Sequence, residues 1–232
     1  MLKTIKKSKK NVPWEQGYNI KNTAWSKHPP VLLKEFLELV KTSSNGSVLH
    51  LDLGCGNGIK TVEYAKNGLN TLGIDISASG IAEAKKLIGG LSLSKICQVI
   101  EASCLHLPVD ENSVSSASDI LCLTHFNAEE REKYLKEIYR VLVKGSYLLF
   151  ELFSDKDKHF HGHPVSKSYY FSYDPKNHFM EGYAHYDGMY NVHFGKNDVE
   201  TTFKNFEIIK MKEFKHPLYD YRRLWNVILR KP

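Results

Sequence analysis

Short apolar runs alternate along the chain with longer stretches in which apolar residues recur every three or four positions. The first pattern is typical of buried strands and the second of helices packed on a sheet. The predicted strands are Val48–Leu53, Asn70–Ile74, Ile96–Ile100, Val114–Cys122, Tyr147–Phe153, Phe206–Met211 and Leu224–Leu229. Helices are predicted over about Val31–Lys41, over Ile59–Lys66, from Ser77, and from Asn127 to a left-handed stop at Gly145. This alternation predicts an α/β domain with a largely parallel sheet.

One of the predicted strands is assigned from position more than from pattern. The stretch Val114–Cys122 contains three serines and an aspartate, which is unusually polar for a strand, so we assign it from its place in the order. The last two strands are joined by Lys212–Arg223 alone. A connection this short is compatible with an antiparallel pair.

The first strand ends in a carboxylate followed by glycines at alternate positions. Asp52 precedes Gly54, Gly56 and Gly58, and a helix is predicted to follow. Glycine adopts backbone angles closed to other residues and lets another molecule approach the main chain. A strand, a glycine turn and a helix at the carboxyl edge of a sheet form the place where nucleotide-like ligands bind in doubly wound folds. A turn without a ligand is the plain alternative for this motif alone.

A second carboxylate favours the ligand site. The second strand ends at Asp75, 21 residues after Gly54, close to the spacing of about 20 at which an acid meets a ribose diol. Neighbouring parallel strands place the turn and this acid on opposite sides of one crevice. The alternative for Asp75 is a helix cap, but Ser77 suits that role better.

The segments Asp52–Gly58 and Leu72–Ser77 together resemble the class I S-adenosylmethionine-dependent methyltransferases. The resemblance is to a small-molecule branch that includes thiopurine, tellurite-type and type 11 methyltransferase domains. It implies S-adenosyl-L-methionine as the cofactor. It also implies an α/β, Rossmann-like, doubly wound sheet of seven strands, mostly parallel with one antiparallel strand near the C-terminus, and helices on both faces.

The same resemblance implies roles for individual residues. The turn that contains Gly54, Cys55 and Gly56 would wrap the methionine portion of the cofactor, with Asp52 near its amino group. Asp75 would then hold the ribose. For Cys55, a small space-filling side chain is the simpler interpretation.

The adenine end of the site is less well supplied with polar groups. Ile76 would pack on the adenine. The segment Ser103–Pro108 is similar to the family segment after the third strand, where an acid or amide often contacts the adenine amino group. Here Ser103 stands at that position, beside Cys104, and its hydroxyl makes a weaker contact than a carboxylate.

A nicotinamide-dependent dehydrogenase is the main rival for a nucleotide crevice. Its usual pattern is Gly-x-Gly-x-x-Gly with an apolar residue before the first glycine. This chain has Gly-x-Gly-x-Gly with Asp52 two residues before it. A cofactor with a free amino group gives that acid a role, which favours the methyltransferase.

The length of 232 residues fits one domain with a sizeable core. We divide the chain into a basic flexible tail at 1–12 and a single methyltransferase domain at 13–232, with a lid inserted at about 154–196. That segment holds six of the eleven histidines and six of the thirteen tyrosines. Long loops in compact domains are usually functional or disordered, and the family often inserts a substrate-covering lid after the fifth strand.

Aromatic residues in the lid and near the N-terminus are candidates to enclose ligands. Tyr190 in the lid is a candidate for contact with the acceptor. Tyr18 and Trp25 resemble the leading segment of the small-molecule branch, which folds over the cofactor, and an aromatic face attracts a sulfonium. The alternative for each is ordinary packing onto the sheet.

His125 is the candidate general base, in case the acceptor is a hydroxyl. It follows the fourth strand at the edge where the family places substrate groups, and a neutral imidazole suits proton removal near pH 7. A structural role next to the following helix is an equal alternative. Arg222 can pair with an acidic group of the substrate, although a solvated edge is the plainer interpretation.

The net charge of +6 depends on the N-terminus. Five lysines lie in the first ten residues, and without them the chain carries 27 basic and 26 acidic residues. A basic tail is usually solvated, and it adds only salt-sensitive affinity for nucleic acid. Nucleic acid is therefore a possible but not favoured partner, and a small-molecule acceptor is preferred.

Other features narrow the class of protein. No apolar run is long enough to span a membrane, no secretory signal is evident, and the four unpatterned cysteines indicate a reducing compartment, which predicts a cytoplasmic protein. Three alternating histidines, His159, His161 and His163, lack a convincing further ligand, so we predict no metal.

Two alternatives to small-molecule methylation stay open from the sequence. One is an RNA (tRNA) or protein methyltransferase on the same core. The other is a non-catalytic S-adenosylmethionine-binding module, for which the polar fourth strand and Ser103 leave room.

Overall fold

A computed structural model describes residues 28–43, 49–157, 163–164, 170–172, 190–217 and 222–232. The helices are α2 (Leu33–Ser43), α3 (Ile59–Lys66), α4 (Ala78–Gly90), α5 (Ala128–Val141) and α6 (Lys196–Thr202), with a 3-10 turn η1 (Leu123–His125). The strands are β1 (Leu49–Leu53), β2 (Asn70–Asp75), β3 (Cys97–Glu101), β4 (Val114–Ile120), β5 (Leu142–Ser154), β6 (His163–Pro164), β7 (Tyr170–Ser172), β8 (Tyr190–Phe194), β9 (Glu207–Lys215) and β10 (Arg223–Arg230).

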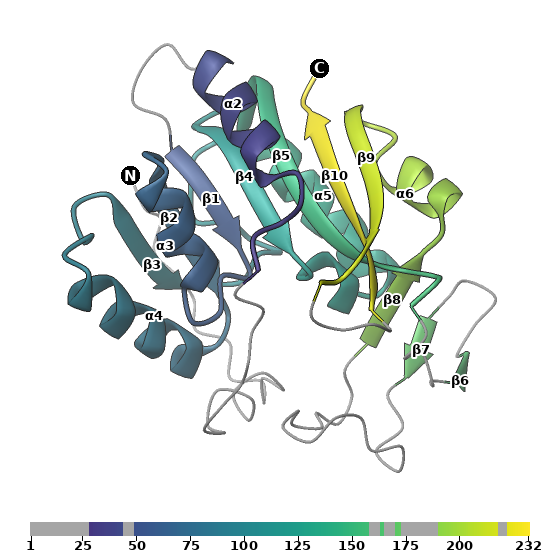
Figure 1. Ribbon diagram of the computed structural model, residues 1–232, viewed down its shortest axis with the longest axis horizontal. Helices are drawn as coiled ribbons and strands as arrows, with labels where there is room; N and C mark the ends of the chain where they lie inside the picture. The colour runs from purple at the N-terminus through teal and green to yellow at the C-terminus, as the bar shows by residue number, and fades with distance from the viewer. Residues whose placement is uncertain (1–27, 44–48, 158–162, 165–169, 173–189, 218–221) are drawn as a thin grey trace.

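These strands form one mixed sheet (Figure 1). The seven expected strands lie in the order β3-β2-β1-β4-β5-β10-β9, and β10 is antiparallel to both of its neighbours. Three short strands, β6 to β8, add to the expected seven. Of these, β8 pairs in parallel with the end of β5 through Phe153 and Ser154. The predicted Rossmann-like class, with a reversed strand near the C-terminus, is confirmed.

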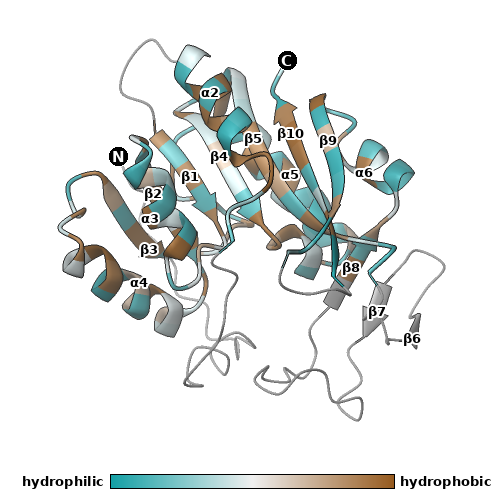
Figure 2. Ribbon diagram, in the orientation of Figure 1, coloured by the Kyte–Doolittle hydropathy of each residue, from teal (hydrophilic) through white to brown (hydrophobic). Residues whose placement is uncertain are grey.

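Helices cover both faces of the sheet because successive strand residues point to opposite sides. In β5, Leu148 and Phe150 pack with α5 and α6 on one face, whereas Leu149 packs with α2 on the other. A third cluster joins α3 and α4 to β3. Figure 2 shows the hydrophobic colour of the central β10 beside the more hydrophilic edge strand β9.

The sequence predicts the start of α5 correctly but not its end. Its start is fixed by a capping box between Asn127 and Glu130, as the pattern indicates. The predicted end of this helix at Gly145 is wrong, because α5 stops at Val141 and β5 begins with the next residue. Gly145 has φ +83 as expected, but it lies inside β5, in a stretch where the pairing with β4 changes register.

Several predictions lie outside the described residues. These are the basic tail at 1–12, Tyr18 and Trp25, and much of the proposed lid at 154–196. Of Tyr190 only the backbone is described, in β8. None of the helices in the described ranges is both long and apolar enough to cross a membrane.

Candidate functional site

The carboxyl end of β1 opens into the glycine turn. Gly54, Gly56 and Gly58 have φ angles of +69, +52 and +79, in the left-handed region that favours glycine. A Cβ atom added to Gly54 would lie 2.7 Å from Cys122 Sγ, and one added to Gly58 would lie 2.7 Å from Ala84. The turn therefore needs glycine both for its backbone angles and for its close packing.

Asp75 links the glycine turn to the start of α4. Its Oδ2 accepts a hydrogen bond from the Gly56 amide at 2.8 Å, and its Oδ1 accepts one from the Ser77 amide at 2.8 Å. Ser77 caps α4 through the Gly80 amide, as predicted. The two oxygens of Asp75 therefore join the glycine turn to the first residues before α4.

Asp52 lies one residue before the end of β1 and is only 2 % exposed. Its Oδ2 accepts a hydrogen bond from Thr61 at 2.7 Å, and its Oδ1 accepts one from Ser118 at 3.1 Å. Burial raises the pKa of Asp52 to about 6, against the opposing effect of these two hydroxyls. Two adjacent elements, α3 and β4, thus orient this carboxylate beneath the glycine turn.

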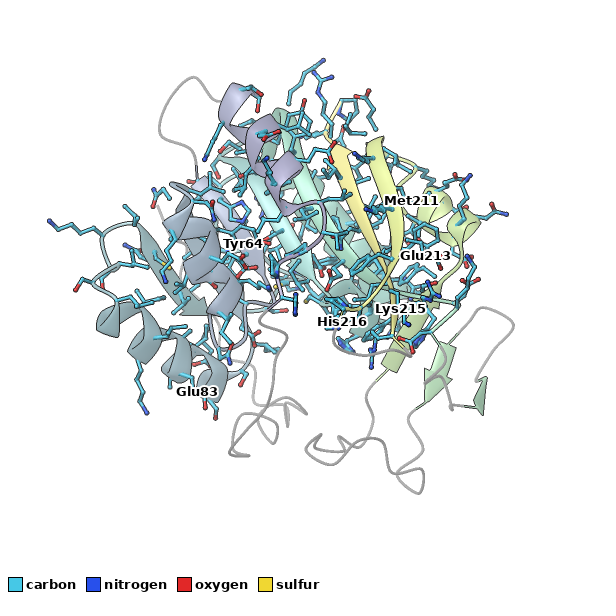
Figure 3. All side chains as sticks on the ribbon, viewed as in Figure 1. Tyr64, Glu83, Met211, Glu213, Lys215 and His216 are labelled. Carbon is cyan, nitrogen blue, oxygen red and sulfur yellow. The ribbon has the colours of Figure 1, made fainter. Side chains whose placement is uncertain are left out.

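A buried polar seam continues from Asp52 along β1 and β4. His50 contacts Ser116 at 2.9 Å through Nδ1 and Ser118 at 3.1 Å through Nε2, and its ring lies 4.4 Å from that of Tyr64. Tyr64 is labelled in Figure 3 beside α3. Burial lowers the pKa of His50 to about 3. The unusual polarity of the fourth strand is therefore explained by the partners that its serines find across the sheet.

The residues predicted for the adenine side are Ile76, Ser103 and Cys104, and Cys55 is predicted for the methionine side. Ile76 is 38 % exposed beside the end of β2. Ser103 Oγ accepts a hydrogen bond from the Leu105 amide, and the buried Cys104 Sγ lies 3.9 Å from the Ile74 carbonyl oxygen. Cys55 belongs to the cluster under α3 and α4. That packing favours its space-filling interpretation, while the cofactor contacts of all four residues stay predictions.

Asp119 fixes the segment that follows β4. Its Oδ1 accepts from the Cys122 amide at 2.7 Å, and its Oδ2 accepts from the Leu123 amide at 2.9 Å and from the Tyr134 hydroxyl at 2.6 Å. Leu121, between them, has φ +70, which is strained for a residue with a side chain. The carboxylate thus holds a strained turn that places Cys122 against Gly54. Burial raises the pKa of Asp119 to about 7.

A second group of side chains surrounds Phe153 at the carboxyl end of β5. The His125 ring meets the Phe153 ring edge-on at 6.2 Å, and the His193 ring stacks on it at 5.2 Å. Arg222 Cζ lies over the same ring at 4.7 Å, and Arg222 Nε lies 3.1 Å from Asp157 Oδ2. The structure therefore brings the predicted residues His125 and Arg222 to one ring.

Several residues of this edge were not found from the sequence. Thr61, Ser118 and Asp119 lie on predicted elements, but their partners come from other elements and leave no local pattern. Phe153 and Asp157 look like ordinary strand-end and loop residues. Only the excess of polar residues in the fourth strand indicated that its side chains serve something other than a hydrophobic core.

Comparisons with known proteins agree with this geometry. A family model described as a methyltransferase domain matches residues 51–150. EEF1A lysine methyltransferase 2 of Homo sapiens is 37% identical over 110 residues, which is 43% of this chain and 45% of that protein. Demethylmenaquinone methyltransferase of Lactobacillus johnsonii is 32% identical over 112 residues, 47% of this chain and 44% of that protein.

The similarity of structure extends further than the similarity of sequence. A SAM-dependent methyltransferase from Methanosarcina mazei superposes with a TM-score of 0.67 at 23% identity, covering 83% of this chain and 96% of that one. This chain spans less than half the length of these two curated relatives. Residues 51–150 thus match a methyltransferase domain, and the glycine turn, the acid at the end of β2 and the strand order agree with that match.

Proposed function

We propose that this protein is a methyltransferase that binds S-adenosyl-L-methionine and transfers its methyl group to a small-molecule acceptor. The observation that carries the proposal is the pairing of the glycine turn after β1 with Asp75 at the end of β2, joined by the hydrogen bond from the Gly56 amide. The glycine turn exposes backbone that can contact the amino acid portion of a ligand, and the Asp75 carboxylate can accept hydrogen bonds from a ribose.

The residues at this edge suit the cofactor in several ways. Asp75 has acceptor capacity for the ribose hydroxyls, and the exposed Ile76 offers an apolar surface for the adenine. Gly54, Cys55 and Gly56 line the methionine portion, with Asp52 close to its amino group. Ser103 and Cys104 are proposed for the adenine end, and Tyr18 and Trp25, outside the described residues, are candidates from the resemblance alone to cover the cofactor.

When bound, the cofactor supplies an electrophilic methyl carbon on a positively charged sulfur. The protein's part is to align the acceptor and to exclude water, and alignment alone contributes about 7–11 kcal/mol in favourable cases. His125 stands after β4, where it can take a proton from a hydroxyl acceptor. Tyr190 and Arg222 contact the acceptor from β8 and from the start of β10. A thiolate or carboxylate acceptor needs no base.

Titration calorimetry with S-adenosyl-L-methionine and with S-adenosyl-L-homocysteine tests the cofactor claim first. We expect one site per chain for each, and failure of both to bind would remove the proposal. A methyl-transfer screen with thiols, amines, phenols, transfer RNA and protein then tests the acceptor class. Turnover of RNA or protein alone would replace the small-molecule acceptor, and binding without any turnover would indicate a non-catalytic module.

The role of His125 is tested with the variant His125→Gln. If it is a general base, the variant loses about 100-fold or more in kcat for a phenol acceptor and little for a thiol that is already ionised. The measurement is the release of S-adenosyl-L-homocysteine against pH for both acceptors. Equal losses for the two would assign His125 a structural role against Phe153.

A further inference from the structure

Arg222 is held in place by two neighbours from other elements. Its Nε lies 3.1 Å from Asp157 Oδ2, and its Cζ lies 4.7 Å above the Phe153 ring. The Asp157 side chain is 1% exposed, whereas that of Arg222 is 27% exposed. A guanidinium held at Nε by a carboxylate and at its face by a ring has little freedom left to rotate. The expectation of a solvated edge does not describe this residue.

The guanidinium approaches Asp157 with its Nε. Arginine has five N–H groups in a planar fork, of which four are on the two terminal nitrogens. The ion pair with Asp157 forms at Nε. The two terminal nitrogens of the guanidinium can therefore donate hydrogen bonds to a second partner. This fork is the geometry that binds a carboxylate or a phosphate through two parallel hydrogen bonds.

Stability alone explains the buried ion pair poorly. Taking a carboxylate out of water costs several kcal/mol, and buried pairs often contribute no more than apolar residues of the same size. An orienting role for Asp157 accounts for a carboxylate at this depth. His193, which stacks on the same Phe153 ring, stays neutral because burial lowers its pKa to about 3. Arg222 is thus the fixed positive charge beside this ring.

The position of Arg222 relative to the glycine turn also matters. The short segment after β4 joins the two sites, because Cys122 packs against Gly54 and His125 packs against Phe153. Arg222 reaches Phe153 from the position just before β10. Its carbonyl oxygen accepts a hydrogen bond at 2.9 Å from the amide of His216, which is labelled in Figure 3. The guanidinium therefore lies at the carboxyl end of β5, whereas Asp75, where the adenosine is proposed, lies at the end of β2, with β1 and β4 between them.

We propose that Arg222, oriented by Asp157 and Phe153, binds an anionic oxygen group of the methyl acceptor, either a carboxylate or a phosphate. The acceptor is then a small anionic molecule whose charge is held on the β5 side while its nucleophile faces the glycine turn. This assignment goes further than the proposed function and rests on it.

The test measures binding of simple anions to protein saturated with S-adenosyl-L-homocysteine. The probes are benzoate, phenyl phosphate and the neutral benzamide, each titrated against the wild type, Arg222→Gln and Arg223→Gln. Arg223 is the matched control, since it is the next residue and carries the same charge. We expect at least a tenfold preference of the wild type for one or both anions over benzamide. Arg223→Gln keeps this preference and Arg222→Gln loses it.

Each outcome separates this inference from the proposed function. Benzamide bound as tightly as the anions, a preference that survives in Arg222→Gln, or no anion bound at about 10 mM would overturn the anion site. If S-adenosyl-L-homocysteine still binds in those cases, the methyltransferase proposal stands. If it does not bind at all, the proposed function fails first.

A second variant distinguishes orientation from bulk charge. Asp157→Asn keeps the Arg222 cation but replaces its carboxylate partner with a neutral amide. If Asp157 orients the fork, anion affinity falls severalfold although the local net charge has become more positive. An affinity that rises instead would show that Asp157 merely neutralises Arg222.

Discussion

At the scale of single residues, the carboxylates of this edge differ in what surrounds them. Asp75 accepts hydrogen bonds from the backbone amides of Gly56 and Ser77 and is 8 % exposed, whereas Asp52 and Asp119 are enclosed by hydroxyls and amides of the fold. Burial raises the pKa of the two enclosed groups to about 6 and about 7. The least enclosed of the three is therefore the one best suited to exchange water for a ligand.

Replacing Asp75 tests this distinction. We expect Asp75→Ala to weaken S-adenosyl-L-methionine binding by about 100-fold or more, because two hydrogen bonds to a charged group contribute about 3 kcal/mol or more together. Calorimetry measures the affinity, and circular dichroism checks that the fold persists. Glu111→Ala, on an exposed loop, serves as control and keeps wild-type affinity. An unchanged affinity in Asp75→Ala would refute the ribose role.

His50 gives a pH-dependent effect of known sign. Its pKa is about 3 in the folded protein and near 6.5 when unfolded, so the unfolded chain binds the extra proton as pH falls below 6.5. The contribution of His50 to stability is complete above that pH and is lost toward pH 3. Asp52, with its raised pKa, acts in the opposite direction, so the variant comparison is needed to isolate His50.

We therefore expect acid to destabilise the wild type more than His50→Gln. Between pH 6.5 and pH 5 the gap in unfolding free energy shifts by about 2 kcal/mol toward the variant. Urea unfolding at both pH values measures it. Imidazole NMR signals of His50 that do not titrate above pH 5 support the cause, and a midpoint near 6.5 would contradict it.

At the scale of elements, the glycine turn and the segment after β4 are locked together. Gly54 packs closely against Cys122. Asp119 accepts hydrogen bonds from the amides of Cys122 and Leu123, which hold the strained Leu121 in place. A change in either element is therefore transmitted to the other. The segment after β4 therefore connects the proposed cofactor residues to His125, the proposed base.

Alanine at two glycines separates backbone strain from packing. Gly54→Ala adds both a left-handed alanine and a clash at 2.7 Å, whereas Gly68→Ala, at φ +92, meets nothing within 4 Å. We expect Gly54→Ala to lower the unfolding free energy by about 3 kcal/mol or more and Gly68→Ala by about 1–2 kcal/mol. Denaturant unfolding checks both. Equal losses would mean that Cys122 moves aside freely.

Local pattern predicted much of this edge, and long-range pairing decided the rest. A few consecutive residues are enough to predict the turn after β1, the acid at the end of β2 and the capping box of α5. The helix stop at Gly145 failed because pairing of Leu142 with Val114 starts β5 earlier. The ion pair of Arg222 and Asp157 joins residues far apart in sequence, so spacing does not reveal it.

At the scale of the whole molecule, the proposed cofactor site draws on the segments that follow β1, β2 and β3. A ligand held by all of them binds the folded chain alone and so stabilises it by mass action. The gain in unfolding free energy depends only on the ligand concentration and the dissociation constant, whichever contacts produce the affinity.

We expect S-adenosyl-L-methionine at 100 times its dissociation constant to raise the unfolding free energy by about 2.7 kcal/mol. For a domain of this size the melting temperature rises by roughly 5–10 °C. Scanning calorimetry over a range of cofactor concentrations measures the shift, and at the same concentration Asp75→Ala shows a much smaller one. If the melting temperature of the wild type does not change with cofactor concentration, the cofactor does not bind the folded state.

The place of β10 in the sheet has a consequence for how the chain is made. β10 is the last described strand to leave the ribosome, yet it fills the gap between β5 and β9 and pairs with both. Until residues 223–230 emerge, β5 has an uncovered apolar edge, which is a template for unwanted association. Completion of the sheet must therefore wait until residues 223–230 have been made, and nascent chains held short of β10 would be the form that most needs a chaperone.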